Sequence, residues 1–168
     1  MRDGGDRTRA RLGMTPAFMQ EAIRLSIEMM GQGGGGPFGA VVVKDGQILS
    51  RGWNQVTGAN DPTAHAEVMA IREACRALRT FHLDGCDIYA SCEPCPMCLG
   101  AIYWARCSRL YFAATRSDAA AAGFDDELIY QELALPPASR RLPSLQLLRE
   151  AALPAFAAWR GKADRVGY

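Results

Sequence analysis

Two short motifs constrain the fold of this chain more than any other feature of its 168 residues. The first is His65-Ala66-Glu67, and the second is Cys95-Pro96-Met97-Cys98. Imidazole and thiolate groups are preferred ligands of zinc, which proteins bind in a tetrahedral shell. If one zinc ion joins His65, Cys95 and Cys98, the fold must bring two distant segments together at one point.

Each motif stands where a helix is expected to begin. Cys95 and Cys98 are three residues apart, so on a helix they share one face. Pro96 suits the first helical position, because the N–H group that proline lacks would be unpaired there in any case. The positive end of the helix dipole favours thiolates over thiols. With His65 in the first turn of another helix, two helix N-termini can direct three ligands at one ion.

Three protein ligands leave the fourth position of a tetrahedral ion open, which distinguishes a catalytic zinc site from a structural one. A water molecule in that position can have its pKa lowered to about 7. A carboxylate beside the metal can then take the proton of the water and deliver it to a substrate. Glu67, two residues after His65, is the candidate for that role.

A closed structural site is the alternative. Cys92, Cys95 and Cys98 are evenly spaced, and a fourth ligand from Cys92 would complete the shell. Such a chain would be a structural zinc module that binds a protein partner. We expect Cys92 not to be a ligand, because Glu93-Pro94 would have to fold it back onto the metal. The remaining cysteines are predicted to be small core residues: Cys75, Cys86 and Cys107.

Composition favours one globular domain without a membrane or nucleic-acid partner. Apolar residues make up 49% of the chain, charged residues 22%, and the net charge is +1. Residues 1–13 are rich in arginine and glycine and lack the apolar core of a signal peptide, so we expect a disordered tail and a cytoplasmic protein. The pattern leaves open whether translation starts at Met1 or at Met14.

Strand and helix patterns alternate over residues 14–168, which is typical of a single α/β layered domain. Asp45-Gly46 predicts a hairpin turn, and Pro136-Pro137 ends a helical pattern. The glycine-rich run at residues 31–36 has no following Gly-Lys-Ser/Thr, so it predicts a flexible connection and not a phosphate-binding loop. We expect helices over residues 15–30 and 63–78, from the second motif to residue 104, and over 124–134 and 154–160; strands over 39–44, 47–53, 87–90, 109–114 and 145–148; and a loop over 54–62.

The longer segments around the motifs, residues 63–67 and 91–101, resemble the cytidine/deoxycytidylate deaminase superfamily, whose zinc signature the motifs match. Within it the chain is most similar to bacterial guanine deaminases, and the resemblance extends from Met14 to Tyr168. Its more specific parts are Ala122-Gly123-Phe124-Asp125-Asp126 and the C-terminus; further matches are residues 37–40, 52–57, 102–106, 118–130 and 158–160.

This resemblance implies a three-layer fold with a five-stranded mixed sheet between helices, and one zinc ion per chain. It implies that zinc-bound hydroxide attacks the amine-bearing carbon of guanine, a purine, to give xanthine and ammonia. Glu67 would protonate a ring nitrogen, and Asp126 would carry a second proton to the leaving amine. Without the resemblance, Asp126 is an ordinary carboxylate at a helix start, and the choice between Asp125 and Asp126 stays open.

The same resemblance implies the remaining site residues and a homodimer. Asn54 would hydrogen-bond the base, and Phe38 and Trp104 would line the pocket, although either ring is equally consistent with a plain core position. The C-terminal segment would cross to a second subunit, where Tyr168 would close the active site. An exchanged C-terminal segment that carries Phe156 and Trp159 would also bury apolar surface that water disfavours.

Two other enzyme functions are compatible with these motifs. A tRNA adenosine deaminase has the same pattern at residues 61–67 and 52–54, but such an enzyme needs a basic face and stacking aromatic residues. Nineteen basic residues against eighteen acidic residues argue against that partner. A deaminase of another nucleoside or amino-heterocycle, including guanosine or cytosine, also fits the motifs, and the sequence does not separate a free base from a nucleoside.

Overall fold

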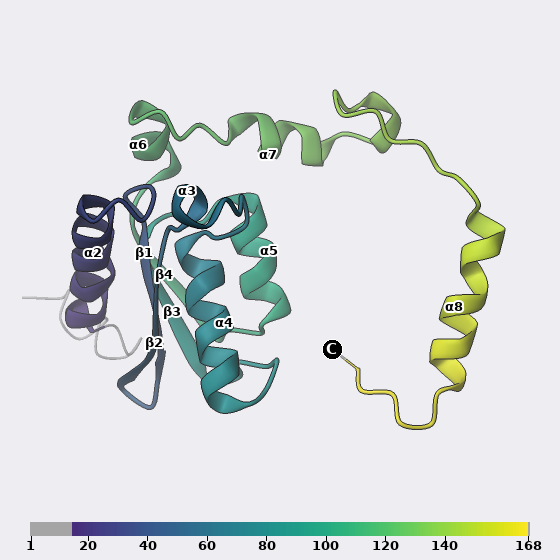
Figure 1. Ribbon diagram of the computed structural model, residues 1–168, viewed down its shortest axis with the longest axis horizontal. Helices are drawn as coiled ribbons and strands as arrows, with labels where there is room; N and C mark the ends of the chain where they lie inside the picture. Colours follow the sequence, from purple (N-terminus) through teal and green to yellow (C-terminus); the bar gives the residue numbers. More distant parts are fainter. Residues whose placement is uncertain (1–14, 168) are drawn as a thin grey trace, which may run out of the picture. The chain divides into compact units, whose positions relative to one another are not determined.

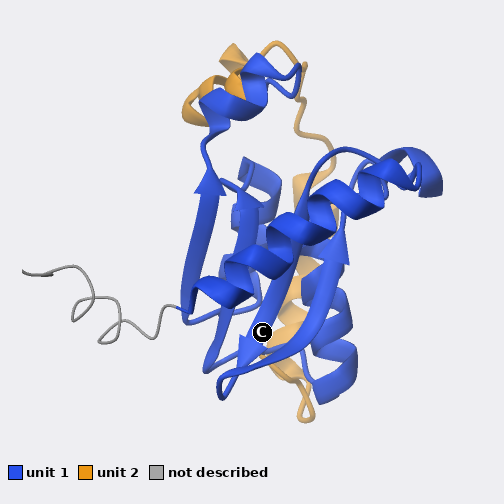
Figure 2. Cartoon of the chain, turned by 90° about the vertical axis from the view of Figure 1, so that its left-hand side faces the viewer, with its two compact units in different colours: residues 1–125 blue, residues 126–168 orange. Residues whose placement is uncertain are grey.

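The computed structural model describes residues 15–167. The chain divides into two compact units, residues 1–125 and residues 126–168, which Figure 2 shows in different colours. The expected tail at residues 1–13, Met14 and Tyr168 lie outside the described residues.

The first unit is built on a four-stranded mixed sheet in the order β2-β1-β3-β4 (Figure 1). β1 pairs antiparallel with both β2 and β3, and β3 pairs parallel with β4. The predicted hairpin turn is confirmed, because Asp45 and Gly46 both adopt positive φ angles, 50° and 75°, as a tight two-residue turn requires. The strands are β1 (Gly39–Lys44), β2 (Gln47–Trp53), β3 (Cys86–Cys92) and β4 (Arg109–Ala114).

Helices cover both faces of this sheet, so the predicted three-layer α/β arrangement is confirmed (Figure 1). The alternation of side chains along β1 explains the layering. Val41 and Val43 face α2 (Pro16–Gly31) in one buried cluster, whereas Ala40 and Val42 pack in another cluster on the opposite face. That second cluster includes residues from α4 (Ala66–Leu78) and α5 (Pro96–Trp104), namely Ala66, Ala70, Ala74 and Ile102.

Gly52 allows α4 to lie unusually close to the sheet. A Cβ atom at this position of β2 would lie 2.2 Å from the carbonyl oxygen of Ala66 and 2.4 Å from the amide nitrogen of Ala70. No side chain fits that space, so glycine is required for the close approach of backbone to backbone. The first turn of α4 is thereby held against the end of β2.

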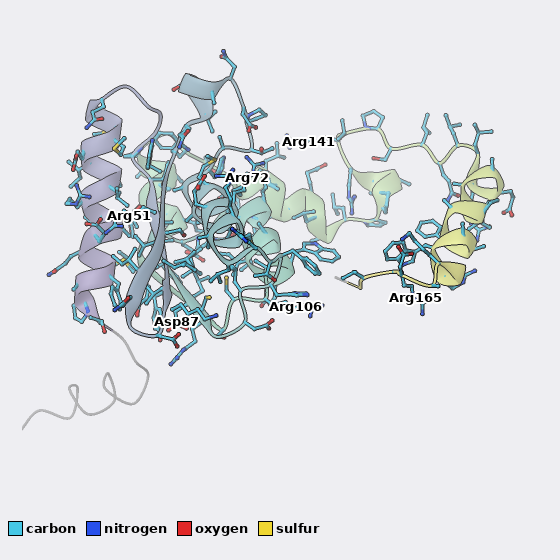
Figure 3. All side chains as sticks on the ribbon, turned by 60° about the horizontal axis from the view of Figure 1, so that its bottom comes forward. Arg51, Arg72, Asp87, Arg106, Arg141 and Arg165 are labelled. Carbon is cyan, nitrogen blue, oxygen red and sulfur yellow. The ribbon has the colours of Figure 1, made fainter. Side chains whose placement is uncertain are left out.

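Ion pairs at the surface join neighbouring elements. Arg51 of β2 donates from Nε to a Glu21 carboxylate oxygen of α2 at 2.6 Å, and Arg109 of β4 pairs with Asp87 of β3 at 3.0 Å. Figure 3 labels Arg51 and Asp87 among the side chains of the first unit. Arg24 also donates to Glu21, so two guanidinium groups lower the pKa of that carboxyl to about 2.

Several expected boundaries shift in the first unit. The helix expected from residue 63 begins at Ala66, with His65 as its N-cap, and the strand expected at 87–90 extends over Cys86–Cys92. The expected loop over 54–62 contains a single helical turn, α3 (Val56–Ala59). One further short helix, α6 (Arg116–Ala121), follows β4, where Thr115 and Asp118 form a reciprocal capping box.

The second unit consists of α7 (Glu127–Ala134), the 3₁₀ turn η1 (Pro137–Ser139) and α8 (Arg149–Gly161). Pro136 precedes η1, and the helical pattern before it ends at Ala134, as predicted. The last helix starts at Arg149 and not at Pro154, so the proline lies inside the helix.

The fifth strand, expected at residues 145–148, is not formed in the described chain, where the sheet has four strands. Leu145, Leu147 and Leu148 are 80–86% exposed, and Leu148 has a left-handed φ of 52°. An extended segment becomes a strand only when a neighbouring strand satisfies its backbone hydrogen bonds, and residues 126–167 contain no strand that could do so. No described helix is long and apolar enough to cross a membrane.

Candidate active site

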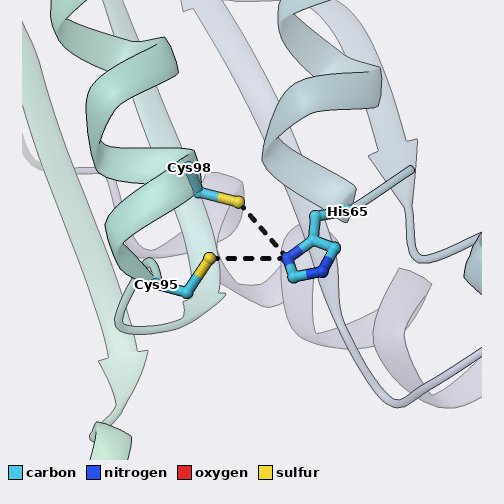
Figure 4. A group of neighbouring side chains, drawn as sticks. All are labelled: His65, Cys95 and Cys98. Atoms are coloured by element: carbon cyan, nitrogen blue, oxygen red, sulfur yellow. Dashed lines mark hydrogen bonds between the residues drawn. The ribbon is translucent and has the colours of Figure 1, made fainter. Parts of the chain in front are cut away.

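The three predicted zinc ligands converge between the N-termini of α4 and α5 (Figure 4). His65 is the N-cap of α4, Cys95 is the N-cap of α5, and Cys98 lies in the first turn of α5. His65 Nδ1 lies 3.6 Å from Cys95 Sγ and 3.5 Å from Cys98 Sγ. Tetrahedral zinc with ordinary Zn–N and Zn–S bonds separates such atoms by about 3.6 Å. The residues therefore fit a zinc ion bound through Nδ1 and two sulfurs.

The two cysteines of this set differ in acidity. A hydrogen bond from Cys98, together with the nearby His65, lowers the pKa of Cys95 to about 4. The same hydrogen bond and burial raise the pKa of the Cys98 thiol. Zinc coordination would deprotonate both thiols.

Glu67 lies beside the ligands without belonging to the set. The residue is only 8% exposed, and Oε2 accepts a hydrogen bond from Cys98 Sγ at 3.4 Å. Burial raises the pKa of this carboxyl, because the apolar surroundings disfavour its charged form. A carboxyl group in this position can hold or release a proton next to the metal.

Cys92 is not part of the ligand group in the described chain, so the closed four-ligand alternative is not supported. Its Sγ instead points toward the carbonyl oxygen of Thr115, at 3.5 Å. The prediction for the other three cysteines is confirmed: Cys86 is buried in the core, and Cys75 and Cys107 pack against it.

Asn54 follows directly after β2 and is buried, and the next residue of the chain contacts the segment that carries His65. The N–H of Gln55 donates to the carbonyl of Ala64, the residue before His65, at 2.9 Å. The Oδ1 atom of Asn54 accepts hydrogen bonds from the backbone N–H groups of Gly36 at 3.1 Å and Val56 at 3.2 Å. The orientation of the amide is therefore defined by two donors, with Nδ2 at the other end.

Phe38 and Trp104, the two aromatic residues predicted to line the pocket, lie in different surroundings. The Phe38 ring packs edge-to-face against Phe124 at 4.9 Å, and both rings line a cavity of about 410 Å³ with residues of α2, α6 and the ends of β3 and β4. Sequence reasoning did not include Phe124 in the site, although it lies in the specific motif at residues 122–126. Trp104 ends α5 and is 65% exposed; six residues beyond Cys98, it lies about 9 Å farther along the helix axis.

The two remaining predicted residues are not brought to the ligands by the described chain. Asp126 is the N-cap of α7 and the first residue of the second unit, whereas Asp125 ends the first unit. Tyr168 lies outside the described residues. The roles of these residues therefore stay predictions.

Comparison with known proteins places this geometry in a family. Residues 14–114 match the cytidine and deoxycytidylate deaminase zinc-binding region. The chain belongs to the cytidine and deoxycytidylate deaminase family. The match covers both motifs and all four strands of the sheet, so the zinc site and Glu67 lie within the family region.

Among members of this family, a guanine deaminase from Bacillus subtilis is 53% identical over 151 residues, which is 90% of this chain and 97% of that protein. The X-ray structure of guanine deaminase from Bacillus subtilis superposes with a TM-score of 0.90 at 52% identity, and covers 92% of this chain and 99% of that one. A tRNA-specific adenosine deaminase from Aquifex aeolicus is 49% identical, but over 46% of this chain and 52% of that protein.

Proposed function

We propose that this protein is a zinc-dependent guanine deaminase, which converts guanine and water to xanthine and ammonia. The observation that carries the proposal is a three-ligand zinc site with a buried carboxyl beside it, in a chain that matches a guanine deaminase over nearly its whole length. The match to the tRNA-specific adenosine deaminase from Aquifex aeolicus covers 46% of the chain at 49% identity, and the match to the one from Bacillus subtilis covers 68% at 36% identity, against 90% at 53% identity for the guanine deaminase.

His65, Cys95 and Cys98 would hold the zinc ion, and as a three-ligand set they would leave a coordination position for water. When bound, zinc lowers the pKa of a water molecule to about 7 and so supplies a nucleophile at neutral pH. Glu67 accepts the proton of that water and transfers it to a ring nitrogen of the base.

Asn54 binds the base in this account. The Oδ1 atom of Asn54 already accepts two backbone hydrogen bonds, so the side chain binds the base by donating from Nδ2. It therefore recognises an acceptor on the purine, such as a carbonyl oxygen or an unprotonated ring nitrogen.

Three further residues complete the proposal. Asp126 carries a proton to the departing amine, and Phe38 and Trp104 line the base pocket. Exchanging the two carboxylates tests the first role: Asp126→Asn is expected to impair turnover far more than Asp125→Asn. The reverse ranking would assign the proton transfer to Asp125.

We also propose a homodimer that exchanges its C-terminal segment. Two observations support it: β4 pairs only with β3 among the described strands, and α8 and the segment before it expose many apolar side chains. Residues 145–148 of one subunit would add the fifth strand at β4 of the other, and Tyr168 would close the partner site. Closure expels water, which strengthens electrostatic interactions inside the site. Apolar residues exposed in this segment are Leu145, Leu147, Leu148, Phe156 and Trp159.

Ammonia release from a panel of substrates tests the proposed function. The purified protein is incubated with guanine, guanosine, cytosine, adenine and an anticodon stem-loop. We expect turnover of guanine and none of cytosine. Comparable turnover of cytosine, or of adenosine in the stem-loop, would assign the protein to another branch of the family.

A further inference from the structure

The glycine-rich segment before β1 contacts Asn54 directly, although its sequence predicts only a flexible connection. The backbone N–H of Gly36 donates to Asn54 Oδ1 at 3.1 Å. A Cβ atom on Gly35 would lie 2.4 Å from the same Oδ1 and 2.5 Å from the carbonyl oxygen of Asn54. Both distances are shorter than real Cβ contacts, so the backbone approaches the amide as closely as a glycine permits.

A second element holds Oδ1 from another side. Val56, the first residue of α3, donates its backbone N–H to Oδ1 at 3.2 Å. Gly58 of the same helix packs against the glycine-rich segment, since a Cβ there would lie 3.1 Å from the carbonyl oxygen of Gly34. The segment and α3 therefore form one support around the Asn54 side chain.

This support determines which end of the amide is available. If the Asn54 amide were reversed, its NH₂ group would face two backbone N–H donors, and three donors would meet without an acceptor. In the observed orientation Oδ1 accepts from both backbone N–H groups, and the Nδ2 group points away from these two donors. Because Asn54 is buried and Oδ1 makes both of these hydrogen bonds, the orientation of the amide is fixed.

We propose that Gly35 and Gly36 are positioning residues, which fix the Asn54 amide so that Nδ2 donates to the bound base. The inference rests on the proposed function, in which Asn54 binds guanine. Gly35 provides the space that Oδ1 occupies, and Gly36 provides one of the two donors. Neither glycine touches the substrate in this account.

Gly35→Ala tests the proposal, with Gly34→Ala as the matched control. The control adds the same methyl group one residue away, where the nearest atoms lie at 3.4–3.5 Å. We expect Gly35→Ala to lower kcat/KM for guanine by about 10²-fold, as a displacement of about 1 Å in a substrate-positioning group does. The zinc content is expected to stay at that of the wild type, and calorimetry is expected to show a similar loss of affinity for 8-azaguanine as the binding probe.

A double-mutant cycle distinguishes a loss of Asn54 positioning from a general disruption of the fold. In an Asn54→Ala background, adding Gly35→Ala is expected to cause less than about a threefold further loss, because residues that act through one another are not additive. The inference would be overturned if the losses of kcat/KM from the two substitutions multiplied fully, or if Gly35→Ala had the same kcat/KM as Gly34→Ala. In either case, guanine turnover by the wild type would still uphold the proposed function. A wild type that releases no ammonia from guanine overturns both.

Asn54→Asp provides a test that does not depend on the folding of Gly35→Ala. The carboxylate can accept the same two backbone hydrogen bonds but has no donor at the Nδ2 position. We expect this variant to fold and to bind zinc, and to lose 8-azaguanine affinity and guanine turnover. Wild-type affinity in Asn54→Asp would show that Nδ2 does not donate to the base.

Discussion

Gly52→Ala is expected to damage both stability and catalysis, because Gly52 sets the distance between β2 and α4. An alanine Cβ would lie 2.2 Å from the carbonyl oxygen of Ala66. To reach even the shortest real contact of 3.0 Å, α4 must move away by about 0.8 Å. That movement carries His65 and Glu67 with it, since they cap and begin the same helix.

The magnitude follows from that displacement. Overpacking a well-packed core costs about 1–3 kcal/mol, which lowers the Tm of a chain of this length by about 3–10 °C. A shift of about 1 Å in positioned catalytic groups lowers the rate by about 10²-fold. Together these values predict a folded protein with a reduced Tm and a much lower kcat/KM for guanine.

Thermal unfolding and ammonia release measure the two effects, and Gly31→Ala is the control. Gly31 ends α2, and a Cβ there would meet no atom within 4 Å, so its substitution is expected to leave both quantities near wild type. A Gly52→Ala protein with the Tm and kcat/KM of the wild type would refute the reasoning from close packing.

Three further predictions concern the site, the surface and the C-terminus. Glu67→Gln keeps the shape of the side chain but removes its proton acceptor, so zinc content should be unchanged and kcat should fall by about 10²-fold or more; a rate near wild type would make Glu67 structural. Glu21→Gln should lower the free energy of unfolding at pH 7 by about 1 kcal/mol, because its Arg24 and Arg51 partners are half exposed. Since the folded pKa of Glu21 is lowered from 4.5 to about 2, this difference should be complete above pH 4.5 and disappear as the pH falls toward 2; a difference that persists at pH 2 would contradict it. Mixing a Glu67→Gln chain with a chain that lacks residues 167–168 should restore guanine turnover, because one site of the mixed dimer has both intact parts; no recovery despite proven subunit exchange would place the C-terminus in its own site or in none.

The core and the metal site were predictable from the sequence because their signals are local. Apolar runs bounded by a turn predict the β1–β2 hairpin, and ligand types at helix starts predict the convergence of His65, Cys95 and Cys98. The spacing of Cys92 allowed a fourth ligand, and only the geometry of the folded chain excludes it from the group.

The features that were not predictable depend on contacts between distant residues. The glycine-rich segment has the composition of a flexible linker, yet its backbone holds Asn54, which lies 18 residues away from Gly36. A strand at residues 145–148 needs a neighbouring strand, and the described part of the second unit contains none, so the apolar pattern alone was not sufficient to form a strand. Trp104 carries no periodic signal that tells a pocket position from an exposed helix end.

Zinc removal and restoration, followed by ammonia release from guanine, tests the central claim most directly. The purified protein should contain about one zinc per chain, because it has one three-ligand set. Exhaustive chelation should abolish ammonia release, and stoichiometric zinc should restore it in the wild type but not in Cys98→Ala. Full guanine turnover by protein proven free of metal would contradict the account.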